Sequence, residues 1–353
     1  MAYLKWVEPW GGYNFVEDTG FCNRLFHWEL AYQLNEINNF KFKILLEDYW
    51  WPELEYLELP YTEWWDKHKP TNTDIDRLTP TDLADNKRNR FINYTIPIDS
   101  REMETRQDFV LSDDVDYYPT CGYNFTRQFE EQFDKIRPLQ LVSLKNKQLE
   151  KEIIEKTKGV VGIHIRRGIG VKPHDKDGAI EYVDDKVYTD IMDSILKLNP
   201  NQRFYISADV PKAELQYFYD NYDCFTWDVL NVDKYKVKQK YKILHKHTFA
   251  NVVDLMMLSN TSFLVKVLSS SWSNFAQLYR GSYCCEAYHS GVTEEHRGNP
   301  FSKENYLKGM DGKKEQNLLH FTQPANYKQM SDEGFTLGEN RRKWVRKLTP
   351  TEA

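Results

Sequence analysis

Cysteine is scarce in this sequence, and its spacing fits neither a disulfide framework nor a zinc site. The 353 residues include five cysteines and no C-x-x-C pair. Zinc sites and redox pairs usually show that spacing, and an odd number of cysteines cannot all pair within one chain. We therefore expect reduced thiols in the protein interior, at Cys22, Cys121, Cys224, Cys284 and Cys285.

Long apolar runs are missing as well, and we expect no secretory leader. Residues 252–258 form one of the longest apolar stretches, but Asp254 interrupts it and it is far shorter than the roughly 20 residues of a membrane-spanning helix. The first ten residues contain no basic segment followed by an apolar one. We expect no membrane span and a cytoplasmic location, in the host cell if the chain is viral.

An excess of basic residues is also lacking. The sequence has 47 Lys and Arg residues and 53 Asp and Glu residues, which gives a formal net charge of −6. Proteins that bind nucleic acid generally carry a basic footprint, so we expect no nucleic-acid partner. Binding of an anionic nucleotide stays open, because local charge decides it.

The hydrophobic pattern is that of an α/β protein with two domains. Buried-strand patterns alternate with helical patterns in the C-terminal half, which predicts a parallel sheet with ligands at the carboxyl ends of its strands. The strands are expected at 159–165, 203–207, 262–267 and 283–287, and the helices at 186–197, from Pro211 onward, at 249–258 and at 272–279.

The N-terminal half is less regular. It predicts strands at 2–8 and 41–46 and a helix at 21–38. We place the domain boundary in the Lys/Glu-rich helix before Gly159, so that residues 1–150 form one domain and residues 151–353 the other.

The strongest functional signal is an apolar strand that ends in two arginines. Residues 160–168 read VVGIHIRRG, so the strand ends at His164, Arg166 and Arg167. Arginine suits phosphate because its planar fork donates bidentate, charge-assisted hydrogen bonds. The glycine that follows lets the backbone turn close to a ligand. Pairing of both arginines with surface carboxylates is the simpler alternative.

A serine-rich turn follows a later strand. Residues 268–275 read LSSSWSNF and lead into a predicted helix. Serine is a good N-cap, and the free N–H groups and dipole of a helix N-terminus attract anions. Capping alone explains the serines, but together with Arg166 they predict a two-sided clamp for a diphosphate.

Two carboxylates complete the set. Asp209 ends the strand pattern FYISAD, and Asp254 lies inside the apolar run VVDLMM. An unpaired buried charge is costly, so Asp254 needs a partner or a function. A carboxylate accepts hydrogen bonds from the N–H groups of guanine or from ribose hydroxyls. A salt bridge from Asp254 to an arginine of the same site is the alternative.

The order of these motifs resembles the superfamily of α1,2-, α1,6- and protein O-fucosyltransferases, which includes the nodulation fucosyltransferase. The α1,6 enzymes have a strand ending in His-x-Arg-Arg, a strand ending in Ala-Thr-Asp-Asp, a helix with Asp before Leu-Leu-Ser, and Ser-Ser at a helix start. The corresponding residues here are His164-Ile165-Arg166-Arg167, Ser207-Ala208-Asp209, Asp254 before LMMLS, and Ser270-Ser271. The resemblance covers residues 159–280 well. It covers residues 15–30 loosely, where GFCNRLFH is similar to the glycine–asparagine motif of the α1,2 and protein O-fucosyltransferases.

The resemblance implies a GT-B fold, with two Rossmann-like domains and a cleft between them. It implies an inverting, metal-independent glycosyltransferase that uses a nucleotide-sugar, GDP-fucose first, and a glycan or glycoprotein hydroxyl as acceptor, with no cofactor besides the donor. Arg166 would neutralise the leaving β-phosphate, and Asn23 would face the sugar or the acceptor. The residues implied to bind the donor are His164, Arg166, Arg167, Asp209, Asp254, Ser270, Ser271, Trp272 and Ser273.

The sequence departs from the family after the arginines. Ile169 stands where the family often has Asp, and the stretch in which the α1,6 enzymes keep a catalytic Glu contains Asp175 instead. Asp175 is therefore a candidate base, and Asp177, Glu29 and His27 are alternatives. The aromatic segment with Tyr49, Trp50, Trp51, Trp64 and Trp65 would stack on an acceptor glycan, unless its rings belong to the core.

Three other functions stay open. One is transfer from another GDP- or UDP-linked sugar. The second is a metal-dependent GT-A transferase, because three D-x-D sequences match the pattern that holds a divalent ion, at 74–76, 114–116 and 175–177. The third is a non-catalytic glycan-binding protein with a degenerate site, which Ile169 suggests.

Overall fold

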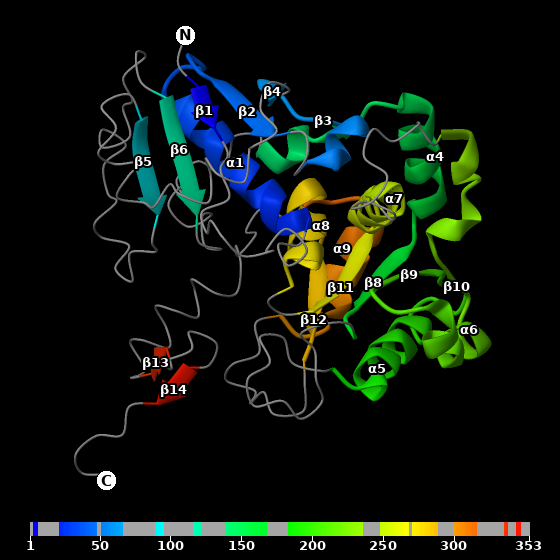
Figure 1. Cartoon of the computed structure of the whole chain (residues 1–353). Helices are drawn as coiled ribbons and strands as arrows, with labels where there is room; N and C mark the ends of the chain where they lie inside the picture. Colours follow the sequence, from blue (N-terminus) through cyan, green and yellow to red (C-terminus); the bar gives the residue numbers. More distant parts are fainter. Residues whose placement is uncertain are drawn as a thin grey trace, which may run out of the picture. The chain divides into compact units, whose positions relative to one another are not determined.

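The computed structural model contains two parallel sheets flanked by helices (Figure 1). The predicted α/β class is confirmed. The structure describes residues 3–5, 21–47, 51–65, 89–94, 116–121, 138–167, 183–235, 248–267, 270–288, 299–315, 335–337 and 344–346. Contacts divide the chain into two compact units, Met1–Lys147 with Lys236–Phe249, and Gln148–Tyr235 with Ala250–Ala353. The cleft, and a boundary at residue 150 between independently folding domains, stay predictions.

The first unit is built on a five-stranded sheet of order β4-β2-β1-β6-β5, in which every pair is parallel. Its strands are β1 (Tyr3–Lys5), β2 (Lys43–Glu47), β4 (Thr62–Trp65), β5 (Asn89–Tyr94) and β6 (Asp116–Cys121). A short antiparallel pair joins β3 (Leu57–Glu58) to β7 (Ser143–Leu144). The turns η2 (Pro52–Glu55) and η6 (Pro138–Leu141) also belong to this unit.

Helix α1 (Phe21–Ile37) is fastened to this unit by polar bonds as well as apolar packing. Trp28 is fully buried, and its Nε1 donates to Thr62 Oγ1 over 2.8 Å. Arg24 makes a bidentate ion pair with Glu53, at 2.9 and 2.5 Å. Because both partners are buried, this pair is satisfied inside the unit.

The second unit is built on a five-stranded sheet of order β10-β9-β8-β11-β12, again parallel throughout. Its strands are β8 (Val161–Ile165), β9 (Phe204–Ala208), β10 (Cys224–Phe225), β11 (Phe263–Val267) and β12 (Cys284–Ala287). Its helices are α4 (Lys147–Thr157), α5 (Asp185–Leu196), α6 (Gln216–Asn221), α7 (Thr248–Ser259), α8 (Ser271–Arg280) and α9 (Lys303–Met310).

The remaining described elements are short. The turns η7 (Lys212–Leu215), η8 (Trp227–Val229) and η9 (Val232–Tyr235) lie in the second unit. Strands β13 (Phe335–Leu337) and β14 (Trp344–Arg346) form an antiparallel pair. The helices and strands predicted from sequence all occur, but Pro211 is the residue before η7, with an extended ψ of 146°, and not the first helical residue.

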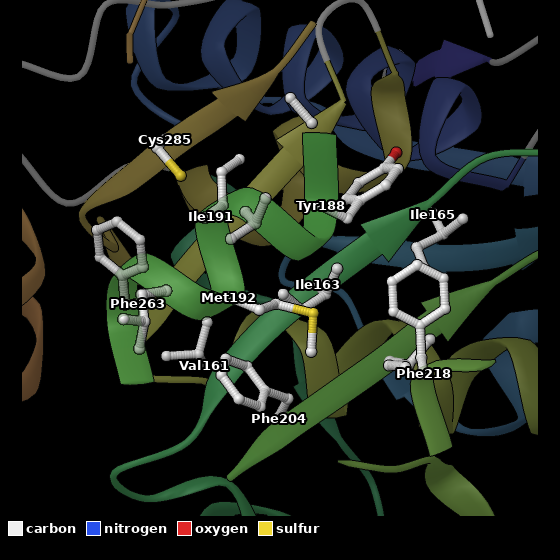
Figure 2. Close-up of a cluster of buried hydrophobic side chains, with 14 of the residues drawn as sticks. Val161, Ile163, Ile165, Tyr188, Ile191, Met192, Phe204, Phe218, Phe263 and Cys285 are labelled. Atoms are coloured by element: carbon white, nitrogen blue, oxygen red, sulfur yellow. The ribbon is translucent and has the colours of Figure 1, made fainter. Parts of the chain in front are cut away.

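Side-chain alternation assigns each face of the second sheet to different helices. Ile163, Phe204 and Phe263 point to one face, where they pack with α5, α6 and α9 in the apolar cluster of Figure 2. The residues between them, Gly162 and Tyr205 among them, point to the face that carries α7 and α8. Polar side chains at the ends of these strands can therefore meet helices on that second face.

The strand order places a topological switch point between β8 and β11. From β8 the chain proceeds to β9 and β10 on one side, and β11 and β12 lie on the other side. In open parallel sheets, ligands bind outside the carboxyl ends of the strands at such a point. The segments that follow β8 and β11 are the ones with the two strongest motifs.

Gly162 lets β8 and α7 approach closely. A Cβ at this position would lie 2.6 Å from Thr261 Oγ1 and 2.9 Å from Leu258 Cδ1. We expect Gly162→Ala to lower the free energy of unfolding by about 1–3 kcal/mol, because these neighbours must move. Thermal unfolding measures the change, and removal of the clash in Gly162→Ala/Thr261→Ala should recover part of it. A Gly162→Ala protein as stable as the wild type would contradict this packing.

Candidate functional site

Arg166 and Asp209 form an ion pair at the carboxyl edge of the second sheet. Arg166 follows β8 and Asp209 follows β9, which are neighbouring strands in register. Arg166 Nη1 contacts Asp209 Oδ2, and the backbone N–H of Arg167 donates to Asp209 Oδ1 over 2.7 Å. Both side chains keep some exposure, at 29% for Arg166 and 23% for Asp209. Asp209 therefore orients Arg166 at a place that a ligand can reach.

Arg167 points toward α5. Its Nη1 donates to the carbonyl of Val183 over 2.5 Å, its Nη2 pairs with Asp185, and its guanidinium lies over the ring of Tyr188 at 5.7 Å. This is the pairing with a surface carboxylate that the sequence left open for the arginines. A role of Arg167 in holding a diphosphate stays a prediction.

Asp254 is held by two hydroxyl groups from β9. Tyr205 Oη donates to Asp254 Oδ1, and Ser207 Oγ donates to Oδ2 over 2.6 Å. Trp272 Nε1, in the first turn of α8, donates to Ser207 Oγ over 3.0 Å. This network connects α7, β9 and α8 on one face of the sheet.

Burial raises the pKa of Asp254 from 3.8 to about 6, against the two hydrogen bonds, which lower it. The carboxyl group therefore changes charge near pH 6. Each of its oxygens has two lone pairs, so an oxygen that accepts one hydroxyl can still accept a ligand N–H. The alternative expected from sequence was a salt bridge between Asp254 and an arginine. Among the described residues, Asp254 pairs with Tyr205 and Ser207 and with no arginine.

His164 lies on β8 opposite Ser207, its partner in the register of β9. The residue is 3% exposed, and its Nδ1 makes no hydrogen bond to any described residue. Burial lowers the pKa of His164 from 6.5 to about 3, with Asp209 raising it and Arg166 lowering it by smaller amounts. The imidazole is therefore neutral at physiological pH and offers one donor and one acceptor.

Helix α8 begins at the carboxyl end of β11, beside the switch point. Ser270 is its N-cap residue, and its side chain makes no capping bond. Ser273 is fully buried, and its Oγ donates to the carbonyls of Val267 (3.3 Å) and Ser270 (3.5 Å). The N–H groups of the first turn of a helix have no partner inside the helix and carry its positive dipole end. Ser271 supplies the first of these N–H groups.

Several predicted residues lie outside what the structure describes. Asn23 belongs to the first turn of α1, but its side chain is not among the described ones, and the same holds for His27. Asp175 and Asp177 lie outside the described residues. Glu29, an alternative base, is 2% exposed inside α1.

The prediction that the aromatic segment stacks on an acceptor glycan is wrong for Trp51. Trp51 is fully buried, with the guanidinium of Arg24 at 5.5 Å from its ring, so it is a core residue and cannot stack on a glycan. The residues Tyr49 and Trp50, and the side chains of Trp64 and Trp65, lie outside the described part.

Metal ligands do not gather in the described part of the chain. No group of three or more His, Cys, Asp or Glu side chains occurs there. The D-x-D sequences of the GT-A alternative lie outside it, except Asp116, the first residue of β6. None of the described helices combines the length and apolar character needed to cross a membrane.

The hydrogen bonds of Tyr205 and Ser207 to Asp254 were not predicted from the sequence. Both lie on β9 between Phe204, Ile206 and Ala208, so strand alternation places them on the face opposite to the apolar cluster. Their pairing with Asp254 spans 47 and 49 positions in the chain, which no local pattern reveals. The sequence signal was the alternation itself, with two hydroxyl residues on one face of an otherwise apolar strand.

No protein-family model and no curated protein matches the chain. Solved structures do resemble it. An Arabidopsis thaliana FUT1 mutant in complex with GDP is 13% identical, with a TM-score of 0.47, over 82% of this chain and 70% of that one.

The fucosyltransferase NodZ from Bradyrhizobium is 9% identical, with a TM-score of 0.45, over 81% of this chain and 95% of that one. NodZ α-1,6-fucosyltransferase soaked with GDP-fucose is 10% identical, with a TM-score of 0.42, over 81% and 94% of the two chains. These proteins bear the name of the enzyme class that the motif order resembles.

Proposed function

We propose that the chain is a glycosyltransferase that moves a sugar from a nucleotide-sugar to an acceptor hydroxyl, with GDP-fucose as the first candidate donor. One observation carries the proposal. The Arg166–Asp209 pair after β8 and the N-terminus of α8 after β11 flank the switch point of a parallel sheet. A cation and a helix N-terminus at that place suit a diphosphate.

The nucleoside would lie on the α7 and α8 face of the sheet. Asp254 offers carboxylate oxygens, and His164 lies opposite Ser207, which donates to Asp254. Guanine presents an amino group and an imino N–H on one edge, which a carboxylate accepts together. This complementarity favours a GDP-linked donor over a UDP-linked one.

In the proposed reaction, the acceptor oxygen forms a bond to the anomeric carbon while the bond from that carbon to the β-phosphate oxygen breaks. The electron pair of the broken bond leaves with GDP, and the acceptor proton passes to a base. Attack from the side opposite the leaving group inverts the anomeric centre. Arg166 and the N–H groups of α8 would stabilise the charge that develops on the diphosphate. The mechanism requires no metal ion or cofactor besides the donor.

Asp209 has a positioning role in this proposal. It holds Arg166 and the backbone of Arg167 from the neighbouring strand, so that the guanidinium is placed before the donor arrives. Preorganised charge of this kind needs no reorganisation during the reaction. The other proposed donor ligands are Arg167, Ser270, Ser271, Trp272 and Ser273, and Asn23 and Asp175 are proposed to act at the sugar and at the acceptor proton.

The test is donor turnover followed by mass spectrometry. The full chain is incubated with GDP-fucose and a set of glycan and glycoprotein acceptors, in EDTA and separately in Mn²⁺. We expect release of GDP and an acceptor heavier by one deoxyhexose in both conditions. Turnover that EDTA abolishes and Mn²⁺ restores would favour the metal-dependent alternative. Glycan binding without turnover of any donor would favour the non-catalytic one.

A further inference from the structure

A buried lysine lies beneath α8, in a place where apolar side chains usually pack. Lys266 belongs to β11, and its parallel partner on β12 is Glu286. Lys266 Nζ lies 2.9 Å from Glu286 Oε1, and the two side chains are only 3% and 2% exposed. Charges so deeply buried persist only where partners satisfy them.

The ammonium group bonds to the helix as well as to the strand. Lys266 Nζ donates to Gln277 Oε1 over 2.9 Å and to Asn274 Oδ1 over 3.1 Å. Both acceptors lie on α8, three residues apart and therefore on one side of the helix. With Glu286, they provide one acceptor for each of the three donors of the ammonium.

The charge on Lys266 is maintained by its surroundings. Burial lowers the pKa of Lys266, but the surrounding groups, Glu286 foremost and with it Cys284 and Glu315, together outweigh burial and raise the pKa. The second oxygen of Glu286 accepts from Tyr288 Oη over 3.0 Å. Glu315 lies nearby, and burial raises the pKa of its carboxyl group. Lys266 therefore keeps its charge, and Tyr288 orients the second oxygen of its partner Glu286.

The same contacts reach the beginning of α8. The backbone N–H of Asn274, whose side chain Lys266 holds, donates to the carbonyl of Ser270 over 3.0 Å. Ser273 Oγ bonds to the carbonyl of Val267, the residue after Lys266. The first turn of α8 is thus connected to β11 by directional hydrogen bonds. These bonds restrict the rotation of the helix about its axis and its height above the sheet more than apolar packing does.

We propose that Lys266 and Glu286 are positioning residues, and that their ion pair sets the place of the α8 N-terminus and hence the affinity for the donor diphosphate. This inference rests on the proposed function. Replacing a buried ion pair by apolar residues often leaves stability unchanged, so stability alone does not explain the pair. A fixed helix end explains it, because bonds to a diphosphate depend on the placement of the donor N–H groups.

The experiment is calorimetric titration of GDP into the full chain, well below the unfolding temperature. Lys266→Met removes the charge and keeps the length of the side chain. We expect its dissociation constant for GDP to rise about 3- to 30-fold. Ile195→Val on α5 is the control, because it removes a methyl group from a fully buried residue on the opposite face. We expect it to lower the unfolding temperature and leave GDP affinity unchanged.

A folded Lys266→Met protein that binds GDP as the wild type does would overturn the inference. If this variant fails to fold, Gln277→Met decides, since it keeps the ion pair and removes one acceptor on the helix. Unchanged affinity in Gln277→Met would then overturn the inference, and weakened affinity would support it. A wild type that binds no nucleotide would instead refute the proposed function, and this inference with it.

Discussion

Arg166→Ala is expected to lower kcat for sugar transfer by about 100- to 1000-fold, the usual cost of one preorganised donor to a developing charge. The guanidinium lies at the carboxyl end of β8, oriented by Asp209, where the proposed diphosphate leaves. Arg166→Lys keeps the charge but loses the planar fork, so it should recover only part of the rate. Initial rates of GDP release give kcat for the wild type, Arg166→Ala and Arg166→Lys.

The matched control for Arg166 is Arg203→Ala. Arg203 precedes β9, at the opposite end of the strands, and pairs with Asp223 at 3.2 Å. Both side chains of this pair are at least half exposed, so its loss should change stability by less than about 1 kcal/mol and leave kcat unchanged. Wild-type turnover in Arg166→Ala, or an equal loss in Arg203→Ala, would contradict the role of Arg166.

Asp254→Asn is expected to weaken GDP binding by about 10- to 100-fold, since a hydrogen bond to a charged acceptor is typically worth 1.5–3 kcal/mol. Asparagine keeps the size of the side chain and one oxygen but presents an amide N–H₂ where a carboxylate oxygen was. The amide N–H₂ would face a donor group of guanine, Tyr205 or Ser207, and it cannot accept a hydrogen bond from that group. Equilibrium titration of GDP measures the change.

The pH dependence of GDP affinity gives a second measurement on Asp254. Burial raises the pKa of its carboxyl group to about 6, and only the ionised form accepts two N–H groups. Affinity should therefore rise as the pH increases through about 6, and Asp254→Asn should lack this rise.

The stability of the protein should show the opposite trend. The folded pKa of about 6 exceeds the ordinary 3.8, so Asp254 destabilises the fold as the pH rises between these values. The control variant for these pH experiments is Asp193→Asn. Asp193 lies on α5, and its carboxylate accepts a hydrogen bond from Tyr222 Oη over 3.0 Å. GDP affinity that is independent of pH in the wild type would contradict the placement of the nucleoside at Asp254.

The strands of the second unit were predictable because strands buried in a parallel sheet appear in sequence as short, nearly continuous apolar runs. β8, β9, β11 and β12 each begin within two residues of the expected position. The residues at their ends were predictable for the same reason, since a polar group directly after an apolar run lies at the sheet edge.

The order of the strands was not predictable in this way. That β8 lies between β9 and β11, and so makes a switch point, depends on pairing between segments about 40 and 100 residues apart. Arg167 illustrates the same limit. Its sequence neighbour Arg166 remains at the ligand edge, whereas Arg167 pairs with Asp185 at the start of α5. The two adjacent arginines have different partners, Asp209 after β9 and Asp185 on α5, and the fold brings both of these carboxylates to the end of β8.

Lys266 is a signal of a buried ion pair that the sequence itself contains. A single lysine inside the run FLVKV is unusual for a buried strand, as Asp254 is for an apolar helix. Its partner Glu286 stands in the same way inside CCEA. Two isolated charges of opposite sign in two apolar strands predict a buried pair if those strands are neighbours, but the pairing itself comes from the fold.

The most direct test of the account is thermal unfolding of the full chain with GDP, UDP and ADP, each in EDTA and in Mn²⁺. A ligand at 100 times its dissociation constant stabilises the folded protein by about 2.7 kcal/mol, which corresponds to an increase of several degrees in Tm. We predict that GDP raises the Tm equally in EDTA and in Mn²⁺ and that UDP and ADP raise it less. No increase with any nucleotide, or an increase that requires Mn²⁺, would contradict a metal-independent diphosphate site at Arg166 and α8.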